Sequence, residues 1–401
     1  GQASIITASN RFNFGTQHIL SANGLDNLFA GANSGLLNLG NNNAFFGAKS
    51  GQENKQGQEN SFFGSYAGQN NVTGNGNSFF GYFAGNATTT GNENSFFGNR
   101  SGQVNTSGAF NSFFGTFSGF FNTTGSDNSF FGNSSGYNNT GGNRNSFFGS
   151  QTGRLNVGDD NAFLGSFAGQ ANTSGSNNSF VGSLAGQANA TGINNSFMGS
   201  RAGHDNTASN NSFFGTEAGR FNTIGANNTF LGRNAGHDNT AGELNVFIGV
   251  NAGTGNQLGR LNTIVGAEAN VLGTNLSYAT AIGAEAIVNS SNTIVLGRTS
   301  GADAVRIPGN VNVLGTLSAA NLSVQATNIT GVIPTANGGT GLSSPGTAGR
   351  FLRSDGTNWV SSLFTAGDVP QGSGFYIQNG TTQQGSTNFN ISGNGTAGGT
   401  F

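Results

Sequence analysis

One five-residue word, Asn-Ser-Phe-Phe-Gly, returns every 17 residues along most of this 401-residue chain. Clear copies begin at Asn43 (with Ala44 in place of Ser), Asn60, Asn77, Asn94, Asn111, Asn128 and Asn145. Looser copies begin at Asn161, Asn178, Asn195, Asn211, Asn228, Asn245 and Asn262, and two of the steps are 16 residues long. So short and regular a period predicts one small supersecondary unit stacked on itself, rather than a globular domain with a cleft.

Three glycines recur at fixed positions when the unit is numbered from its first Asn. The consensus is N-S-F-F-G-x-x-A-G-x-x-N-T-x-G-x-x, with Gly at positions 5 and 9 and usually at position 15. Glycine at a fixed position indicates a corner, where the backbone needs a positive φ or a close approach. Because Gly interrupts every stretch and no 3.6-residue period is present, the pattern argues against helix and predicts coils of short strands.

The two adjacent Phe residues predict the oligomeric state. Position 3 is Phe in 13 of the 14 copies, and position 4 is apolar in all of them. Neighbouring residues of a strand point to opposite faces, so one ring can fill the coil while the other must face outward. Such a long apolar stripe exceeds what a soluble monomer exposes. We therefore expect a parallel homotrimer with Phe ladders along its axis, although the pattern does not decide which Phe points outward.

Asn recurs at position 12 as well as at position 1. Position 12 is Asn in nearly every coil from Asn54 to Asn256, with Thr88 as an exception. At both positions we expect stacked amide ladders that also satisfy backbone groups at the corners. The alternative interpretation is a sugar- or ice-binding face made of Asn and Thr.

The repeat extends beyond its clear copies. Gly15 and Gly31 continue the spacing towards the N-terminus, and Gly283 and Gly297 continue it towards the C-terminus, which predicts roughly 18 coils. We expect an all-β parallel β-roll or β-solenoid with five segments. These are an N-terminal β junction or first coil (1–26), the repeat array (27–297), a β-stalk connector (298–330), a small β knob (331–370) and a Gly/Asn/Gln-rich β stalk (371–401).

Two patterns after the array support the last three segments. Val305, Ile307, Val311 and Val313 alternate with polar or turn-forming neighbours, as in half-buried strands. Further along, residues 351–360 predict a β-hairpin that turns at an Asp-Gly pair.

The composition excludes several partners. Only 7% of the residues are charged, against about 25% in an ordinary domain. The net charge is -2, and without a basic run we expect no binding to nucleic acid. Cys is absent, which excludes disulfides and is compatible with an extracellular protein. No apolar run approaches the ~18 residues that span a bilayer, so we expect no membrane insertion.

The sequence predicts no catalytic, cofactor-binding or metal-binding residue, and hence no enzyme. The 16 acidic residues are scattered, and the pair Asp159-Asp160 falls at a corner, where Asp commonly turns the chain. The run from Gly338 to Gly341 lacks the strand-to-helix context of a phosphate-binding loop, so we interpret it as a turn.

Two His-Asp pairs were the strongest metal candidates. His204-Asp205 and His237-Asp238 occupy positions 10 and 11 of coils that lie two steps apart. Two steps amount to about 9.6 Å at strand spacing, which is too far for one metal within a chain. Three symmetry-related His could bind a metal if position 10 faced a trimer axis. However, position 10 varies widely between coils, as expected of a solvent surface.

Two resemblances follow from these motifs. The repeat resembles the heads of trimeric autotransporter adhesins, whose shorter coils carry an Asn-Ser-x-x-x-Gly word and stack as a left-handed parallel β-roll trimer. Residues 307–317, 336–341 and 352–359 look like segments of bacterial tail-fibre-like surface proteins, in which similar arrays lie beside such knobs. Together the resemblances cover most of the chain. They imply a trimeric fibre at the bacterial cell surface but indicate almost nothing about a ligand; a surface glycan or host receptor is the candidate partner of such a fibre.

The leading hypothesis is a non-enzymatic extracellular fibre or adhesin, and we expect this chain to be one section of a longer fibre that continues head to tail into further modules. The alternatives are a functional amyloid-like surface fibre, because short Asn- and Gln-rich repeats are zipper-prone, and a phage-type tail fibre or spike that binds surface glycans. A monomeric ice-binding solenoid would leave the outward apolar stripe unexplained.

Overall fold

The computed structural model describes residues 11–14, 17–21, 24–298, 303–318, 342, 347–363, 365 and 368. The chain divides into two compact units, Gly1–Pro308 and Gly309–Phe401, which are described separately. Within the described ranges the regular structure is β, without an α-helix. Accordingly, no helix there has the length and apolar character needed to cross a bilayer.

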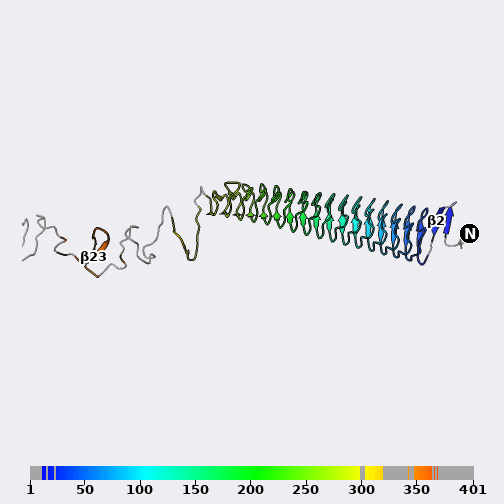
Figure 1. Ribbon diagram of the computed structural model, residues 1–401, viewed down its shortest axis with the longest axis horizontal. Helices are drawn as coiled ribbons and strands as arrows, with labels where there is room; N and C mark the ends of the chain where they lie inside the picture. Colours follow the sequence, from blue (N-terminus) through cyan, green and yellow to red (C-terminus); the bar gives the residue numbers. More distant parts are fainter. Residues whose placement is uncertain are drawn as a thin grey trace, which may run out of the picture. The chain divides into compact units, whose positions relative to one another are not determined.

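The first unit is a parallel β-solenoid in which each coil contributes one short strand to a single sheet (Figure 1). The coil strands are β3 (Leu28–Ala30), β4 (Ala44–Phe46), β5 (Ser61–Phe63), β6 (Ser78–Phe80), β7 (Ser95–Phe97), β8 (Ser112–Phe114), β9 (Ser129–Phe131), β10 (Ser146–Phe148), β11 (Ala162–Leu164), β12 (Ser179–Val181), β13 (Ser196–Met198), β14 (Ser212–Phe214), β15 (Thr229–Leu231), β16 (Val246–Ile248), β17 (Thr263–Val265), β19 (Thr280–Ile282) and β21 (Ile294–Leu296). Near the end of the array, β18 (Asn270–Val271) and β20 (Ile287–Val288) form a second parallel pair.

The solenoid has fewer turns than the spacing predicted. The sheet contains 19 strands, of which β1 (Arg11–Phe14) and β2 (Gln17–Ser21) pair antiparallel rather than parallel. The other seventeen strands, one per coil, are joined by sixteen turns of about 17 residues, so the array has one coil fewer than the roughly 18 expected. The expected coil around Gly15 is therefore replaced by a hairpin, whose second strand pairs antiparallel with β3 at the edge of the stack.

Equivalent residues of successive coils lie directly beside one another. Ser61, Phe62 and Phe63 pair with Ser78, Phe79 and Phe80, and the same register continues through the array. The 16-residue coils keep this register because they lack a residue at position 14. In the coil that begins at Asn145, Gly158 takes the place of position 15, and its carbonyl still accepts a hydrogen bond from Nδ2 of Asn145 at 2.9 Å.

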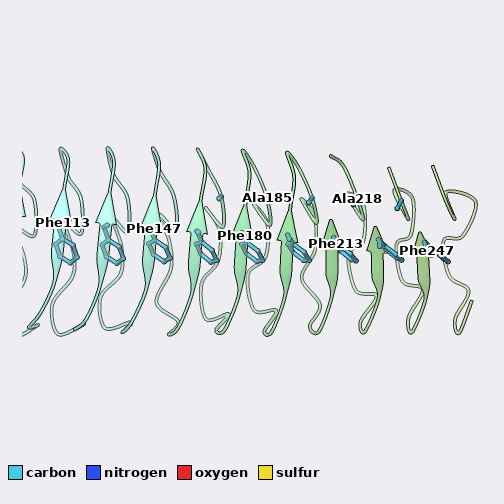
Figure 2. Close-up of a cluster of buried hydrophobic side chains, with 14 of the residues drawn as sticks. Phe113, Phe147, Phe180, Ala185, Phe213, Ala218 and Phe247 are labelled. Atoms are coloured by element: carbon cyan, nitrogen blue, oxygen red, sulfur yellow. The ribbon is translucent and has the colours of Figure 1, made fainter. Parts of the chain in front are cut away.

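The interior contains the position 3 side chains. Phe rings from Phe29 to Phe247 are almost completely buried, and successive rings stack in parallel, as between Phe113 and Phe130 at 4.8 Å between centroids. Figure 2 shows these rings one per coil, with small side chains such as Ala185 and Ala218 beside them. The structure thus shows that position 3 points inward and position 4 outward, which the sequence pattern had left undecided.

The three recurring glycines are needed for different reasons. At position 5, Gly115 has φ +137° and an added Cβ would lie 2.5 Å from the carbonyl oxygen of Gly132. At position 9, Gly119 has φ +57° and its Cβ would lie 2.4 Å from the ring of Phe113. At position 15, Gly125 lacks a positive φ, but its Cβ would lie 2.5 Å from the carbonyl oxygen of Gly142. The interpretation of these glycines as corners or close approaches is confirmed.

Two further corners carry side chains in the left-handed conformation, which the sequence did not reveal. Position 7 and position 17 have positive φ in coil after coil, as at Phe117 (φ 58°) and Asp127 (φ 60°). This conformation costs an L-residue roughly 1–2 kcal/mol. Hydrogen bonds between coils offset it: the backbone N–H of Phe117 donates to Asn99 O, and that of Asp127 to Ala109 O, both at 3.0 Å.

The Asn residues at positions 1 and 12 form buried ladders along the stack. At position 12, Nδ2 of Asn122 donates to Oδ1 of Asn105 and to the carbonyl of Gly125, both at 2.9 Å. At position 1, Oδ1 of Asn128 accepts the backbone N–H of Asn145 at 3.0 Å. Both rows of Asn side chains are buried; we call such a row of equivalent side chains along the stack a rank. The expected structural ladder is therefore confirmed, and the alternative of a ligand-binding face that includes these Asn residues is wrong.

The residues after the array differ in part from expectation. Residues 303–318 contain no strand, and Val305, Ile307 and Val311 are exposed in this single chain rather than half-buried. In the second unit, β22 (Arg350–Ser354) and β23 (Trp359–Leu363) form the expected antiparallel hairpin. Asp355 turns it by accepting the backbone N–H groups of Thr357 and Asn358, which hold the pKa of its carboxyl below the usual value. Most of the expected knob and stalk lies outside the described residues.

Candidate interaction surfaces

The longest surface feature is an apolar stripe that we call the outer ladder, made of the position 4 side chains from Phe46 to Leu296. Its first seven members are Phe, and their rings stack 4.6–4.8 Å apart. From Leu164 onward most members are aliphatic, and several are about half exposed, including Leu164 at 52% and Met198 at 51%. Because equivalent residues pair along the sheet, the stripe is continuous from coil to coil.

The outer ladder offers a large favourable free energy to any apolar surface that covers it. Fully burying a Phe or Leu side chain contributes about 1.5–3 kcal/mol. Stacking within the chain already covers part of each ring, which leaves of order 1 kcal/mol per coil for an external contact. Summed over the array, this exceeds the several kcal/mol that association costs in lost freedom of motion.

A second group of rings, which we call the aromatic cluster, lies at the corner formed by positions 7, 10 and 11; Phe121 is exposed and the other three rings are half-buried. Phe120 and Tyr137 stack across two coils at 5.2 Å, and Phe121 meets both edge-on at 4.6 and 5.3 Å. Phe117 completes the group at 5.6 Å from Phe120. The sequence pattern treated these residues as variable surface positions. The only signal was that aromatic residues occur there outside the two Phe positions of the repeat.

Two arginines flank the aromatic cluster along the stack. The guanidinium of Arg100 lies 5.8 Å from the ring centre of Phe117, and that of Arg154 lies 5.4 Å from the ring centre of Tyr137. Each contact has cation–π geometry. Neither arginine forms an ion pair with any carboxylate of the described part of the chain.

The His-Asp pairs belong to a self-contained ion-pair cluster further along the same corner. His204 and His237 each contact the Asp that follows in sequence, with 2.6 Å between Nδ1 and Oδ1. Between them, the carboxylate of Glu217 lies 3.2 Å from Arg201 and from Arg220. In the ranges that the structure describes, no group of three or more His, Asp or Glu side chains could hold a metal. Both arginines of the cluster thus have a carboxylate partner.

The acidic pair has the structural role expected of a corner. Oδ1 of Asp159 accepts the backbone N–H of Asn143 at 2.7 Å. Asp160 forms a two-point ion pair with Arg144 at 2.6 and 2.9 Å, which lowers the pKa of its carboxyl and raises the pKa of the guanidinium. The run from Gly338 to Gly341 lies outside the described residues.

Comparison with known proteins does not add a family. A scan against protein-family models finds no match to this sequence, and a search of curated proteins finds none either.

Proposed function

We propose that this protein is a non-enzymatic structural fibre or adhesin shaft, in which three parallel copies of the chain bury their outer ladders against one another. The observation that carries the proposal is the outer ladder itself, a continuous apolar stripe along a rigid β-solenoid. The likeness of the repeat to trimeric autotransporter heads and of the later motifs to tail-fibre-like proteins supports an extracellular location at a cell surface.

The distribution of side chains along the outer ladder favours parallel chains. Phe occupies the half that runs from Phe46 to Phe148, and mainly aliphatic residues occupy the other half. Parallel copies in register place rings against rings of the same height and shape. Antiparallel copies would place flat rings against branched side chains. A closed cyclic arrangement of three copies gives every stripe the same environment, as symmetric oligomers require.

The amyloid-like alternative is less consistent with this architecture. Unlimited growth needs an open strand edge at the end of the stack. At the N-terminal edge, the β1–β2 hairpin pairs with β3 and occupies the position that an added coil would take.

The test is the molar mass of the purified chain by light scattering, for wild type and for the triple variant Phe97→Ser, Phe114→Ser, Phe131→Ser. We expect wild type at three times 40.6 kDa and a triple variant, with unchanged circular dichroism, that dissociates to monomer on dilution at a concentration at which wild type stays trimeric. The matched control is Phe110→Ser, because Phe110 is 54% exposed but lies at position 17, away from the outer ladder. A monomeric wild type, or a triple variant that dissociates no more readily than wild type, would contradict the proposal. Polydisperse growing fibrils would favour the amyloid-like alternative.

A further inference from the structure

The aromatic cluster is not explained by the solenoid core or by the outer ladder. Its four rings lie on a different corner of the coil from position 4, and Phe121 is 38% exposed. Position 10, which holds Phe120 and Tyr137, carries Gln at five other coils: Gln52, Gln69, Gln103, Gln170 and Gln187. Elsewhere on this corner, in the described residues, the largest groups of contacting rings are smaller: three rings at Tyr66, Tyr82 and Phe83, and the pair Phe221 and His237. An assembly interface along the array would repeat in every coil, whereas this feature is local.

The charge around the aromatic cluster selects the kind of ligand. The coils that hold the aromatic cluster and its arginines, residues 94–160, contain three arginines and three acidic residues, Asp127, Asp159 and Asp160, none of which lies at position 7 or 10. Arg144 is paired with Asp160, which leaves Arg100 and Arg154 without a carboxylate partner. The ion-pair cluster around Glu217 uses the same positions of the coil but satisfies its own cations. Unpaired cations beside half-buried rings at the surface therefore indicate an anionic ligand that also has apolar faces.

We propose that the aromatic cluster, with Arg100 and Arg154, is a binding site for an acidic polysaccharide. The C–H bonds on the face of a sugar ring carry partial positive charge and pack against the negative face of an aromatic ring. Carboxylate or sulfate groups on the same polymer then bind the two guanidinium groups. A nucleic acid fits less well, because its affinity depends on many phosphate contacts and this surface has few cations.

The surface is long enough for several sugar units. On the N-terminal side, Tyr66 stacks on Phe83 at 4.6 Å, Tyr82 lies edge-on to both, and Lys49 lies 5.4 Å from the ring centre of Tyr66. Positions 7 and 10 thus present cations and rings over six coil steps, from Lys49 to Arg154. Six steps at strand spacing span about 29 Å. This extent matches a polymer rather than a single sugar.

The experiment measures binding of the full-length chain to three probes: polygalacturonate, neutral dextran and single-stranded poly(dT). Phe120→Gln with Tyr137→Gln removes two rings and inserts the residue that the repeat itself uses at position 10. Arg100→Ser with Arg154→Gln removes both cations, using residues that other coils carry at positions 7 and 10. Phe221→Gln is the control, because Phe221 lies at position 11 beside the charge-compensated cluster.

Wild type is expected to bind polygalacturonate, with affinity that falls as salt rises, and to bind dextran and poly(dT) at least tenfold more weakly. Each double variant should weaken polygalacturonate binding at least tenfold, the arginine variant should also lose the salt dependence, and the control should match wild type. Absence of polygalacturonate binding, equal binding by the double variants, or tighter binding of either other probe would overturn the proposal. If Phe120→Gln with Tyr137→Gln changed the molar mass, the aromatic cluster would instead be a contact between copies of the chain, which would also overturn the proposal. Binding is measured separately from molar mass. A monomeric chain that binds polygalacturonate would therefore contradict the trimeric fibre but support the binding site.

Discussion

At the scale of single residues, the coil depends on places where a Cβ atom does not fit. The glycine of position 9 combines a left-handed backbone with direct contact to the buried ring of position 3. These two requirements come from independent sources, namely backbone sterics and packing. Substitution at this position should therefore be costly in any coil.

Gly119→Ala tests this requirement. We expect the free energy of unfolding to fall by about 2–4 kcal/mol, because the new methyl group adds strain at positive φ and crowds the ring of Phe113. The control is Gly141→Ala, since Gly141 lacks a positive φ and its Cβ would meet only Oγ1 of Thr124, at 3.4 Å. The control should change stability by less than about 0.5 kcal/mol in denaturant unfolding. Equal losses in the two variants would contradict the argument.

The buried Asn ladder predicts a pH-dependent effect. In Asn122→Asp, a carboxylate would face Oδ1 of Asn105 and the carbonyl of Gly125, which are both acceptors. Desolvation and these acceptors raise the pKa of the introduced carboxyl in the folded protein above its pKa in the unfolded chain. The stability that the variant has below the unfolded pKa is therefore lost as pH rises through the folded pKa. We expect a loss of about 3–5 kcal/mol at neutral pH.

The measurement for the Asn122 variant is denaturant unfolding at pH 7 and near pH 4, relative to wild type at each pH. The loss should shrink at the lower pH, where the protonated carboxyl can donate a hydrogen bond. Asn122→Leu is the control, because its loss comes mainly from the unsatisfied Oδ1 of Asn105, since the Gly125 carbonyl keeps its bond from Asn111, and this loss does not titrate. A loss in Asn122→Asp that does not vary with pH would show that the ladder does not exclude water.

At the scale of elements, the coil strands are only three residues long and are stable only as a stack. Such strands bury little surface alone, so their stability comes from the neighbours above and below. The ends of the stack therefore need a cover. The β1–β2 hairpin supplies one by pairing antiparallel with β3, although the spacing of Gly15 predicted another coil.

Deletion of residues 1–22 tests the role of this hairpin. It exposes the hydrogen-bonding edge of β3, so we expect end-to-end association that increases with protein concentration. Light scattering over a concentration series detects it. Deletion of residues 347–365, which removes the β22–β23 hairpin, should not have this effect. Concentration-independent mass in the first deletion would show that the edge needs no cover.

At the scale of the whole molecule, the first unit behaves as a one-dimensional array whose coils are interchangeable in register. Each inner rank continues through the same position of the next coil, as between Phe163, Phe180 and Phe197. Removing one complete coil brings equivalent residues of the flanking coils together. Removing half a coil breaks all the ranks at once.

Deletion of residues 178–194, which is one 17-residue coil, should therefore leave the circular dichroism spectrum and the number of chains per oligomer unchanged. Phe163 would then stack on Phe197, and Asn161 would bond to Asn195. Deletion of residues 178–186 is the comparison and should lower the midpoint of thermal unfolding strongly or prevent folding. Similar behaviour of the two deletions would contradict the description of the coils as interchangeable.

Much of this architecture was predictable because the same residue types recur at the same positions of many successive coils. The 17-residue spacing, the glycine corners and the absence of a helical period predicted an all-β coil. The adjacent Phe pair predicted one inner and one outer rank, and the repeated Asn predicted amide ladders. The Asp355-Gly356 pair likewise predicted the turn of the C-terminal hairpin.

Only the tertiary structure decided the remaining features, because each depends on residues that are distant in sequence. Position 3 points inward because its ring packs on the glycine of position 9, and neither Phe is distinguished before the coil closes. The left-handed residues at positions 7 and 17 are held by hydrogen bonds to the preceding coil. The aromatic cluster exists because stacking places Phe120 beside Tyr137, 17 residues away. By itself, the sequence determined the period and the composition of each rank, whereas closure of the coil decided which ranks are buried and which are free to bind.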